Sequence, residues 1–166
     1  VRIPFNNLTE LEKALRSRTV AAFIVEPIQG KGVNMPDDDY LPGALELCRK
    51  YGTLFVADEI QAGLGRTGKF LAVEHWNVEP EIMTMAKGVA NGMPLGVTIA
   101  NPEIADSFKA LTISTFGGNP ISSTAANATI AVMEEIDVRK RAAEMGARLR
   151  EGLDGLKKKY PKTIGD

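Results

Sequence analysis

Three charged side chains directly follow three short apolar runs of the chain. The runs cover residues 20–25, 54–57 and 82–86, and the charged residues after them are Glu26, Asp58 and Lys87. A lysine amine can form a Schiff base with an aldehyde cofactor, and a carboxylate can keep the ring nitrogen of such a cofactor protonated. These residue types predict half of a pyridoxal phosphate site, with Asp58 and Lys87 as catalytic residues.

The apolar runs predict the elements that bring these charges together. Each run is rich in Val, Ile, Leu, Phe or Met and is followed by loop residues, as expected of strands buried on both faces of a parallel sheet. Ligands of open α/β sheets bind at the carboxyl ends of the strands. We therefore expect the three charged side chains to meet at one edge of a sheet.

Strand and helix patterns alternate along the chain. A helix bounded by an Asp cluster and by Gly52 separates the first two runs, which predicts a βαβ unit with parallel pairing. The other expected elements are a glycine-rich active-site loop at residues 59–70, a fourth strand at 95–100, and helices at 103–109, 121–136 and 137–160. The expected fold class is α/β, a three-layer α/β/α sandwich around a mostly parallel sheet. The last helix is highly charged but carries one apolar stripe.

Asp58 and Lys87 each have a second interpretation. A strand-end Asp often caps a turn or pairs with a nearby cation, which here would be Arg66. A lysine in a loop is usually a solvated charge. Lys87, however, follows a buried-looking strand, where its amine would be partly withdrawn from water, and this favours the functional interpretation.

Four further residues offer contacts to a cofactor. Gln61 could donate to a phenolic oxygen, and Ile60 could pack on a ring face. In STFGGNP, the hydroxyls of Ser114 and Thr115 and the glycine N–H groups could form a phosphate cradle at the start of the next helix. Such a motif taken alone is more often a helix cap.

Composition narrows the function classes. The 166 residues are 44% hydrophobic and 25% charged with a formal net charge of -1, typical of an ordinary globular domain. Lys and Arg are dispersed, so we expect neither nucleic acid nor a membrane as a partner. No signal peptide or membrane-length apolar stretch is evident, which favours a cytoplasmic location. The single Cys48 is expected to be a buried apolar residue, and the single His75 has no second His or Cys with which to bind zinc.

Four motifs in sequence order resemble those of the class III pyridoxal-phosphate-dependent aminotransferases. They are VEPIQG from Val25, ADEIQAGLGRTGKF from Ala57, MAKGVANGMPLG from Met85 and STFGGNP from Ser114. The resemblance covers nearly the whole chain, which corresponds to well under half of a family member. It implies that residues 1–136 are part of the large cofactor-binding domain of a fold type I enzyme. Residues 137–166 would then form a long helix leading into a C-terminal small domain outside this chain.

The resemblance also implies a role for each candidate residue. Asp58 corresponds to the partner of the pyridine nitrogen, Ile60 to the ring-facing apolar residue and Gln61 to the family's Gln. Lys87 corresponds to the Schiff-base lysine, and Thr115 to a residue that binds the phosphate of the neighbouring subunit. The implied protein is a homodimer with shared active sites. It would transfer an amino group from an amino acid or amine to a 2-oxo acid, with Glu26 on the substrate side.

The chain departs from the family pattern in several features, and these leave alternatives to the aminotransferase function open. The family's glycine-rich phosphate loop, its ring-stacking aromatic residue and its carboxylate-binding Arg would lie outside this chain, so we expect the isolated chain to be inactive. Lys31 stands where ornithine-type and 4-aminobutyrate-type members commonly carry Glu, which favours the alanine:glyoxylate type. An aminomutase, a dialkylglycine decarboxylase and a non-catalytic structural fragment remain alternatives. A nucleotide-binding domain is disfavoured because no Walker A or GxGxxG fingerprint follows the first strand.

Overall fold

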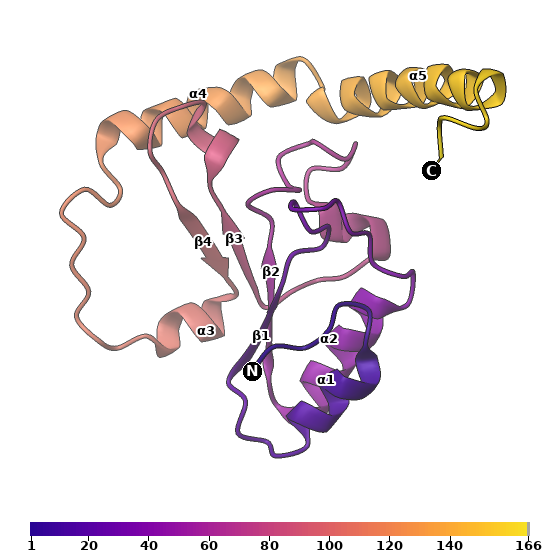
Figure 1. Cartoon of the computed structure of the whole chain (residues 1–166). Coiled ribbons are helices and arrows are strands. Elements are labelled where there is room, and N and C mark those ends of the chain that lie inside the picture. Colours follow the sequence, from indigo (N-terminus) through magenta and orange to yellow (C-terminus); the bar gives the residue numbers. More distant parts are fainter. Residues whose placement is uncertain (166) are drawn as a thin grey trace.

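The computed structural model describes residues 1–165, which form a four-stranded sheet with helices packed around it (Figure 1). The strands are β1 (Ala22–Val25), β2 (Leu54–Asp58), β3 (Ile82–Met85) and β4 (Val97–Ala100). The α-helices are α1 (Leu8–Leu15), α2 (Tyr40–Tyr51), α3 (Pro102–Ser107), α4 (Pro120–Glu135) and α5 (Val138–Lys159), and two short 3₁₀ helices are η1 (Ala72–Trp76) and η2 (Lys87–Ala90). The α/β fold class is confirmed, and the predicted strands and helices occur in the predicted order, whereas α1, η1 and η2 were not predicted.

The sheet order is β1-β2-β3-β4, and β4 alone runs antiparallel to its neighbour within the described residues. The helix α2 crosses between β1 and β2, as the βαβ pattern predicted, and ends at Gly52, whose φ of 72° is left-handed. Parallel pairing places Val25 opposite Ala57 and Asp58 opposite Thr84. The carboxyl ends of the first three strands therefore share one edge.

The main core lies between the sheet and the two helices α1 and α2. Alternation along the strands turns Val25, Phe55 and Ala57 toward these helices, and all three are buried. The helices contribute fully buried residues such as Leu41 and Cys48. The expectation that Cys48 is a buried apolar residue is thus confirmed. This core fixes β1 and β2, and with them the positions at which Glu26 and Asp58 leave the sheet.

Burial on both faces is observed for β2, where Phe55, Val56 and Ala57 are all buried, but not for β1. Ile24 in β1 is 66% exposed, whereas Val25 next to it is 7% exposed. Since neighbouring side chains on a strand point to opposite faces, the face of β1 that α1 and α2 do not cover stays open. The pattern of apolar residues was read correctly as a strand, but covering its second face requires elements that the described residues do not supply.

A second, smaller core joins α4 to the segment after β3. Val89 and Ala90 of η2 pack with Ala126 of α4, and Leu64 of the glycine-rich loop joins them. Figure 1 shows α4 and α5 running end to end across the sheet, with α5 extending beyond it. The helix α4 thereby holds η2, the element that begins at Lys87.

The long charged helix α5 forms as predicted, but its apolar stripe is not buried. Met145, Leu149 and Leu153 are between 50% and 64% exposed, and no residue of the helix is buried. The start of α5 meets the rest of the chain where Val138 and Ala143 lie against the glycine-rich loop. None of the helices in residues 1–165 is long and apolar enough to cross a membrane.

Candidate active site

Lys87 is the first residue of η2, two positions after the end of β3. Its φ of 51° is left-handed, a conformation that costs free energy for a residue with a side chain and that often marks functional positions. The side chain is exposed, so the expected withdrawal of the amine from water does not occur within this chain. The physical reason is that no described element covers the Lys87 side chain itself, although Met85 at the end of β3 is buried.

Gln61 meets Lys87 from the glycine-rich loop after β2. The Nζ of Lys87 donates a hydrogen bond to Oε1 of Gln61. The loop after β1 lies against the same side chain, because a Cβ at Gly30 would come within 2.4 Å of Cγ of Gln61. The segments that follow β1, β2 and β3 therefore converge on Gln61, as the parallel arrangement predicted.

Glu26 follows β1 directly and folds back on its own turn. Its Oε2 accepts a hydrogen bond of 2.9 Å from the backbone N–H of Gly30. The carboxylate thus holds the turn at Gly30, which lies against Gln61. It also lines an open groove. Glu26 therefore positions this turn. Its place on the substrate side stays a prediction.

Asp58 is the last residue of β2 and is half-buried. Its Oδ1 accepts a hydrogen bond of 3.1 Å from the backbone N–H of Ile60, which is the turn-capping arrangement considered as the second interpretation. Pairing with Arg66 is not among the ion pairs of the described residues. This cap fixes the start of the loop that carries Ile60 and Gln61.

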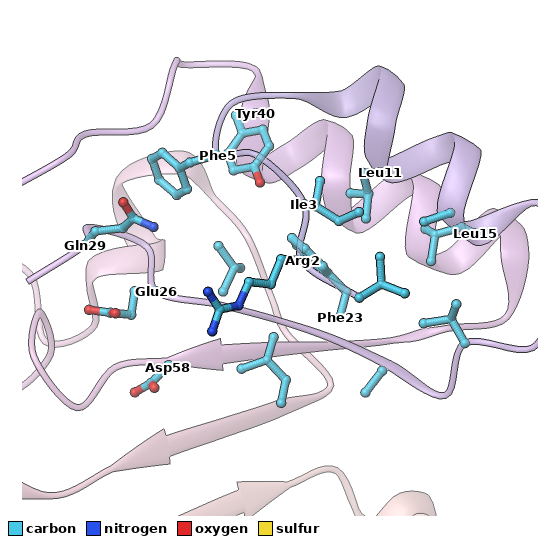
Figure 2. A pocket seen from close by; sticks show the side chains of 16 residues that line it. Arg2, Ile3, Phe5, Leu11, Leu15, Phe23, Glu26, Gln29, Tyr40 and Asp58 are labelled. Atoms are coloured by element: carbon cyan, nitrogen blue, oxygen red, sulfur yellow. The ribbon is translucent and has the colours of Figure 1, made fainter.

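An open groove of about 590 Å³ runs along the outer edge of β1 and reaches the candidate residues. Figure 2 shows the side chain of Arg2 extending toward Glu26 and Asp58, with Phe5 and Tyr40 further along the wall. Both carboxylates therefore border one space that a small molecule can enter from solvent. In residues 1–165 no group of three or more His, Cys, Asp or Glu side chains is placed to bind a metal ion.

Ser114 and Thr115 are not brought to this edge. They lie exposed in the long loop between α3 and α4, which Figure 1 shows on the outer side of β4. Ser114 Oγ accepts a bond of 3.1 Å from the N–H of Gly117, and Asn119 caps α4 by accepting from Ser122 N at 3.0 Å. The helix-cap interpretation of STFGGNP is therefore observed. A phosphate cradle beside Lys87 is not formed by this chain's own loop.

Two residues of the site were missed in the sequence. Glu59, 1% exposed, accepts hydrogen bonds of 2.9 Å from the backbone N–H groups of both Ala72 and Val73. Burial raises the pKa of its carboxyl above the ordinary value, while the two backbone bonds act in the opposite direction. The one sequence signal for Glu59 is that it is a second acidic residue directly after Asp58. The one signal for Gly30 is that it ends the VEPIQG motif.

The groups at this edge fit the chemistry of pyridoxal phosphate. Lys87 supplies an amine for the aldehyde, Gln61 an amide for the phenolic oxygen, and Asp58 a carboxylate for the ring nitrogen. Amine and amide are in direct contact, and the carboxylate begins the loop that carries the amide. The chain is thus an α/β protein that carries an amine, an amide and a carboxylate at the carboxyl edge of its parallel strands, where ligands of such sheets bind.

Comparison with known families makes this assignment specific. Residues 3–166 match the family model "Aminotransferase class-III", and the chain belongs to this family. The resemblance predicted from the four motifs is confirmed.

Named relatives and solved structures agree with the family. The chain is 46% identical over 154 residues to the mitochondrial ornithine aminotransferase of Rattus norvegicus, covering 91% of this chain and 35% of the relative. It is 39% identical over 163 residues to the acetylornithine aminotransferase of Methanocaldococcus jannaschii, covering 95% of this chain and 40% of the relative. The solved ornithine aminotransferase of Plasmodium yoelii is 39% identical, with a TM-score of 0.89 over 97% of this chain and 43% of that one.

These comparisons have two consequences. The chain spans less than half the length of each relative, as the motif content predicted. The relatives are ornithine and acetylornithine aminotransferases, so the preference for the alanine:glyoxylate type that was drawn from Lys31 is not supported. Lys31 is a single position, whereas the similarity to these relatives extends over more than 90% of the chain.

Proposed function

We propose that the complete protein containing this chain is a pyridoxal-phosphate-dependent aminotransferase. It transfers an amino group from an amino acid or amine to a 2-oxo acid. The observation that carries the proposal is the contact between Lys87 and Gln61 at the shared carboxyl edge of three parallel strands, within a chain of the class III family. Family membership supports the cofactor, and the contact supports the assignment of Lys87.

The residues of this chain divide the work by chemical type. Bound pyridoxal phosphate supplies an electron sink that stabilises negative charge on the substrate carbon. Asp58 keeps a proton on the ring nitrogen by charge pairing. Lys87 would hold the cofactor through its amine; once the substrate amine has displaced it, its free Nζ would take the proton from the substrate carbon and deliver it to the carbon of the former aldehyde group. Gln61 restrains the amine of Lys87 and donates its amide N–H toward the phenolic oxygen, and Ile60 packs on the ring.

The remaining contacts in this proposal come from a second copy of the chain. Ser114 and Thr115 lie exposed in the loop beyond β4, away from the edge at which Lys87 lies. A homodimer in which this loop binds the phosphate at the partner's site would use both hydroxyls, and each active site would be shared. Residues 1–136 would belong to the large domain, and residues 137–166 would lead into the small domain.

The proposed donor follows the relatives rather than Lys31. Ornithine and acetylornithine are the donors in the names of the relatives, and each carries an amine far from its α-carboxylate. Glu26 lines the groove and would lie on the substrate side of such a donor. An aminomutase and a dialkylglycine decarboxylase use similar groups around the cofactor, and product analysis of the complete protein with labelled donors separates them from a transaminase.

We also propose that the chain alone is not a competent enzyme and that the complete protein is cytoplasmic. The open face of β1 at Ile24 and the exposed stripe of α5 support the first statement, because exposed apolar faces need further protein to cover them. An amino-transfer assay of the isolated chain tests it, and activity there would contradict it. The single Cys48, which is buried and forms no disulfide, supports a reducing compartment for the second statement, and cell fractionation tests it against the mitochondrial location in the name of the rat relative.

The experiment that tests the function is reductive trapping of the cofactor. Purified complete protein is mixed with pyridoxal phosphate, its visible absorbance is recorded, and borohydride is added before peptide mass mapping. We expect a visible band that borohydride removes and a reduced adduct on Lys87. A specific adduct on any other lysine, or none at all, contradicts the assignment. A measured amino-group transfer from ornithine to 2-oxoglutarate completes the test of the reaction.

A further inference from the structure

Glu59 is a buried carboxylate that the proposed chemistry does not use. It follows Asp58 directly and is 1% exposed, whereas Asp58 is half-buried. Burying a carboxylate is costly unless its oxygens accept hydrogen bonds. Both of its oxygens do so: Oε2 accepts from Ala72 N and Oε1 from Val73 N, each at 2.9 Å. These two bonds offset the cost of burying the carboxylate and tie it to the start of η1.

The contacts of Glu59 close the glycine-rich loop at both ends. At the loop's start, its backbone N–H donates to Thr84 O of β3 at 3.0 Å, and its C=O accepts from Gly63 N at 2.9 Å. At the loop's end, its side chain binds the first two N–H groups of η1. A Cβ at Gly63 would lie 2.8 Å from the C=O oxygen of Glu59 and 3.1 Å from its Oε2, so the loop is folded tightly around this carboxylate.

Gln61 sits inside the segment that Glu59 closes. Gln61 lies two residues after Glu59, and the side chain of Gln61 accepts the hydrogen bond from Lys87. Asp58 fixes only the first turn of the loop, through Ile60 N. The return of the loop toward η1 depends on the side chain of Glu59, so the direction in which Gln61 points depends on it as well.

We infer that Glu59 is a positioning residue for the cofactor site: by closing the loop between β2 and η1, it holds Gln61 against the amine of Lys87. This inference rests on the proposed function, in which Lys87 is the cofactor-binding lysine. Glu59 acts through Gln61 and touches neither cofactor nor substrate. A displacement of Gln61 changes how the amine of Lys87 is held, and small displacements of reacting groups have large effects on their chemistry.

The test compares three variants of the complete protein. Glu59→Gln keeps the size of the side chain but replaces one acceptor oxygen with an N–H donor, so one of the two bonds to η1 is lost. Ala72→Pro breaks one bond from the other side, at the first position of η1, where proline is tolerated and Leu71 already has an extended conformation. Glu74→Gln is the matched control, because Glu74 binds the N–H of Leu71 on the same short helix but is exposed.

Two readouts separate positioning from simple loss of stability. The first is the dissociation constant for pyridoxal phosphate, together with the position of its visible band. We expect Glu59→Gln and Ala72→Pro to weaken binding about tenfold, the effect of losing one hydrogen bond of ordinary strength, and to shift the band. We expect Glu74→Gln to do neither. A lower melting temperature with unchanged binding and an unchanged band would overturn the inference.

The second readout needs no cofactor. In the cofactor-free protein, the rate at which an acylating reagent modifies Lys87 is measured by mass spectrometry, with the exposed Lys69 of the same loop as internal standard. We expect Glu59→Gln and Ala72→Pro to change the rate at Lys87 relative to Lys69, whereas Glu74→Gln leaves the ratio unchanged. Equal ratios in all proteins overturn the positioning role, even where wild-type protein traps the cofactor. Failure of wild-type protein to trap the cofactor overturns the proposed function instead.

Discussion

The amine of Lys87 donates a hydrogen bond to the amide oxygen of Gln61, although 26 positions separate the two residues in the sequence. The contact exists because β2 and β3 are parallel neighbours whose carboxyl ends lie at the same edge. The loop after β2 and the 3₁₀ helix after β3 therefore begin side by side. Three further residues support this pair. Asp58 binds the N–H of Ile60 and Glu59 binds the N–H of Val73, at the two ends of the loop that carries Gln61. Gly30 lies against the side chain of Gln61.

Replacement of Lys87 by Ala in the complete protein is expected to abolish covalent trapping of pyridoxal phosphate. Amino transfer should fall by about 10²–10⁴-fold, the range for loss of a general acid–base group. Mass mapping after borohydride and an amino-transfer assay check this. Lys69→Ala is the control, because that lysine is exposed in the same loop without a contact to Gln61. A trapped adduct on another lysine of the Lys87→Ala protein, with activity retained, would contradict the assignment.

A methyl group added at Gly30 is expected to displace Gln61. In Gly30→Ala the new Cβ would meet Cγ of Gln61 at 2.4 Å and its Cβ at 3.2 Å, so the whole stem of Gln61 must shift. Overpacking of this kind costs about 1–3 kcal/mol in the free energy of unfolding. Chemical denaturation measures that cost, and pyridoxal phosphate binding should weaken in parallel.

The control for this substitution is Gly96→Ala, because nothing lies within 4 Å of a Cβ there and the backbone is not left-handed. Its effect on stability should stay within about 0.5 kcal/mol, as for ordinary surface substitutions. Equal effects of the two substitutions would show that the contact between Gly30 and Gln61 is not tight.

The thiol of Cys48 is expected to be inert in the folded protein. Burial raises its pKa to about 12, so almost no thiolate forms at neutral pH, and the side chain is fully shielded from reagent. Alkylation followed by peptide mapping should find Cys48 unmodified in native protein and fully modified after denaturation. Rapid labelling of the native protein would mean that the core between α2 and the sheet opens readily.

Ionisation of Glu59 is expected to lower stability as the pH rises. Its carboxyl pKa in the folded protein is raised above the ordinary value of 4.5, chiefly by burial, with the charges of Glu74 and Asp58 adding to the effect. The folded state therefore binds the proton more tightly than the unfolded state does. The stabilisation from this group is complete below pH 4.5 and is lost as the pH rises through the folded-state pKa.

The measurement is denaturant unfolding of wild-type protein and Glu59→Gln at several pH values from 4.5 upward. The stability difference in favour of wild type should shrink as the pH rises, because only wild type carries the titrating group. A difference that grows with pH would show that the backbone bonds to Ala72 and Val73 outweigh the effect of burial.

A shared active site predicts that two inactive variants rescue each other. In the proposed dimer, Lys87 of one subunit works with Thr115 of the partner. Mixed dimers of Lys87→Ala and Thr115→Ala chains then contain one intact site and one site that lacks both groups. Co-expression with two affinity tags isolates such hybrids, and we expect activity well above that of either parent. Hybrids no more active than their parents would place Thr115 in its own subunit's site.

The sequence alone indicated most of the elements, their order and the candidate residues of the site. Short apolar runs, Gly52 and the glycines after Asp58 are local signals, and local backbone preferences decide strands, helix ends and turns. The charged residues at the strand ends followed from the same pattern. Because parallel strands present their carboxyl ends at one edge, the placement of Glu26, Asp58 and Lys87 after three such strands indicated one shared edge.

Only the tertiary structure decided which faces are covered and which side chains touch. Ile24 and the stripe of α5 look like core residues in the sequence but are exposed, because burial depends on whether another element covers them. The contacts of Glu59 are with N–H groups 13 and 14 positions away in the sequence. The close approach of Gly30 to Gln61 arises because the loops after β1 and β2 lie against each other. Contacts between distant segments are set by packing of the whole chain, which local sequence patterns do not contain.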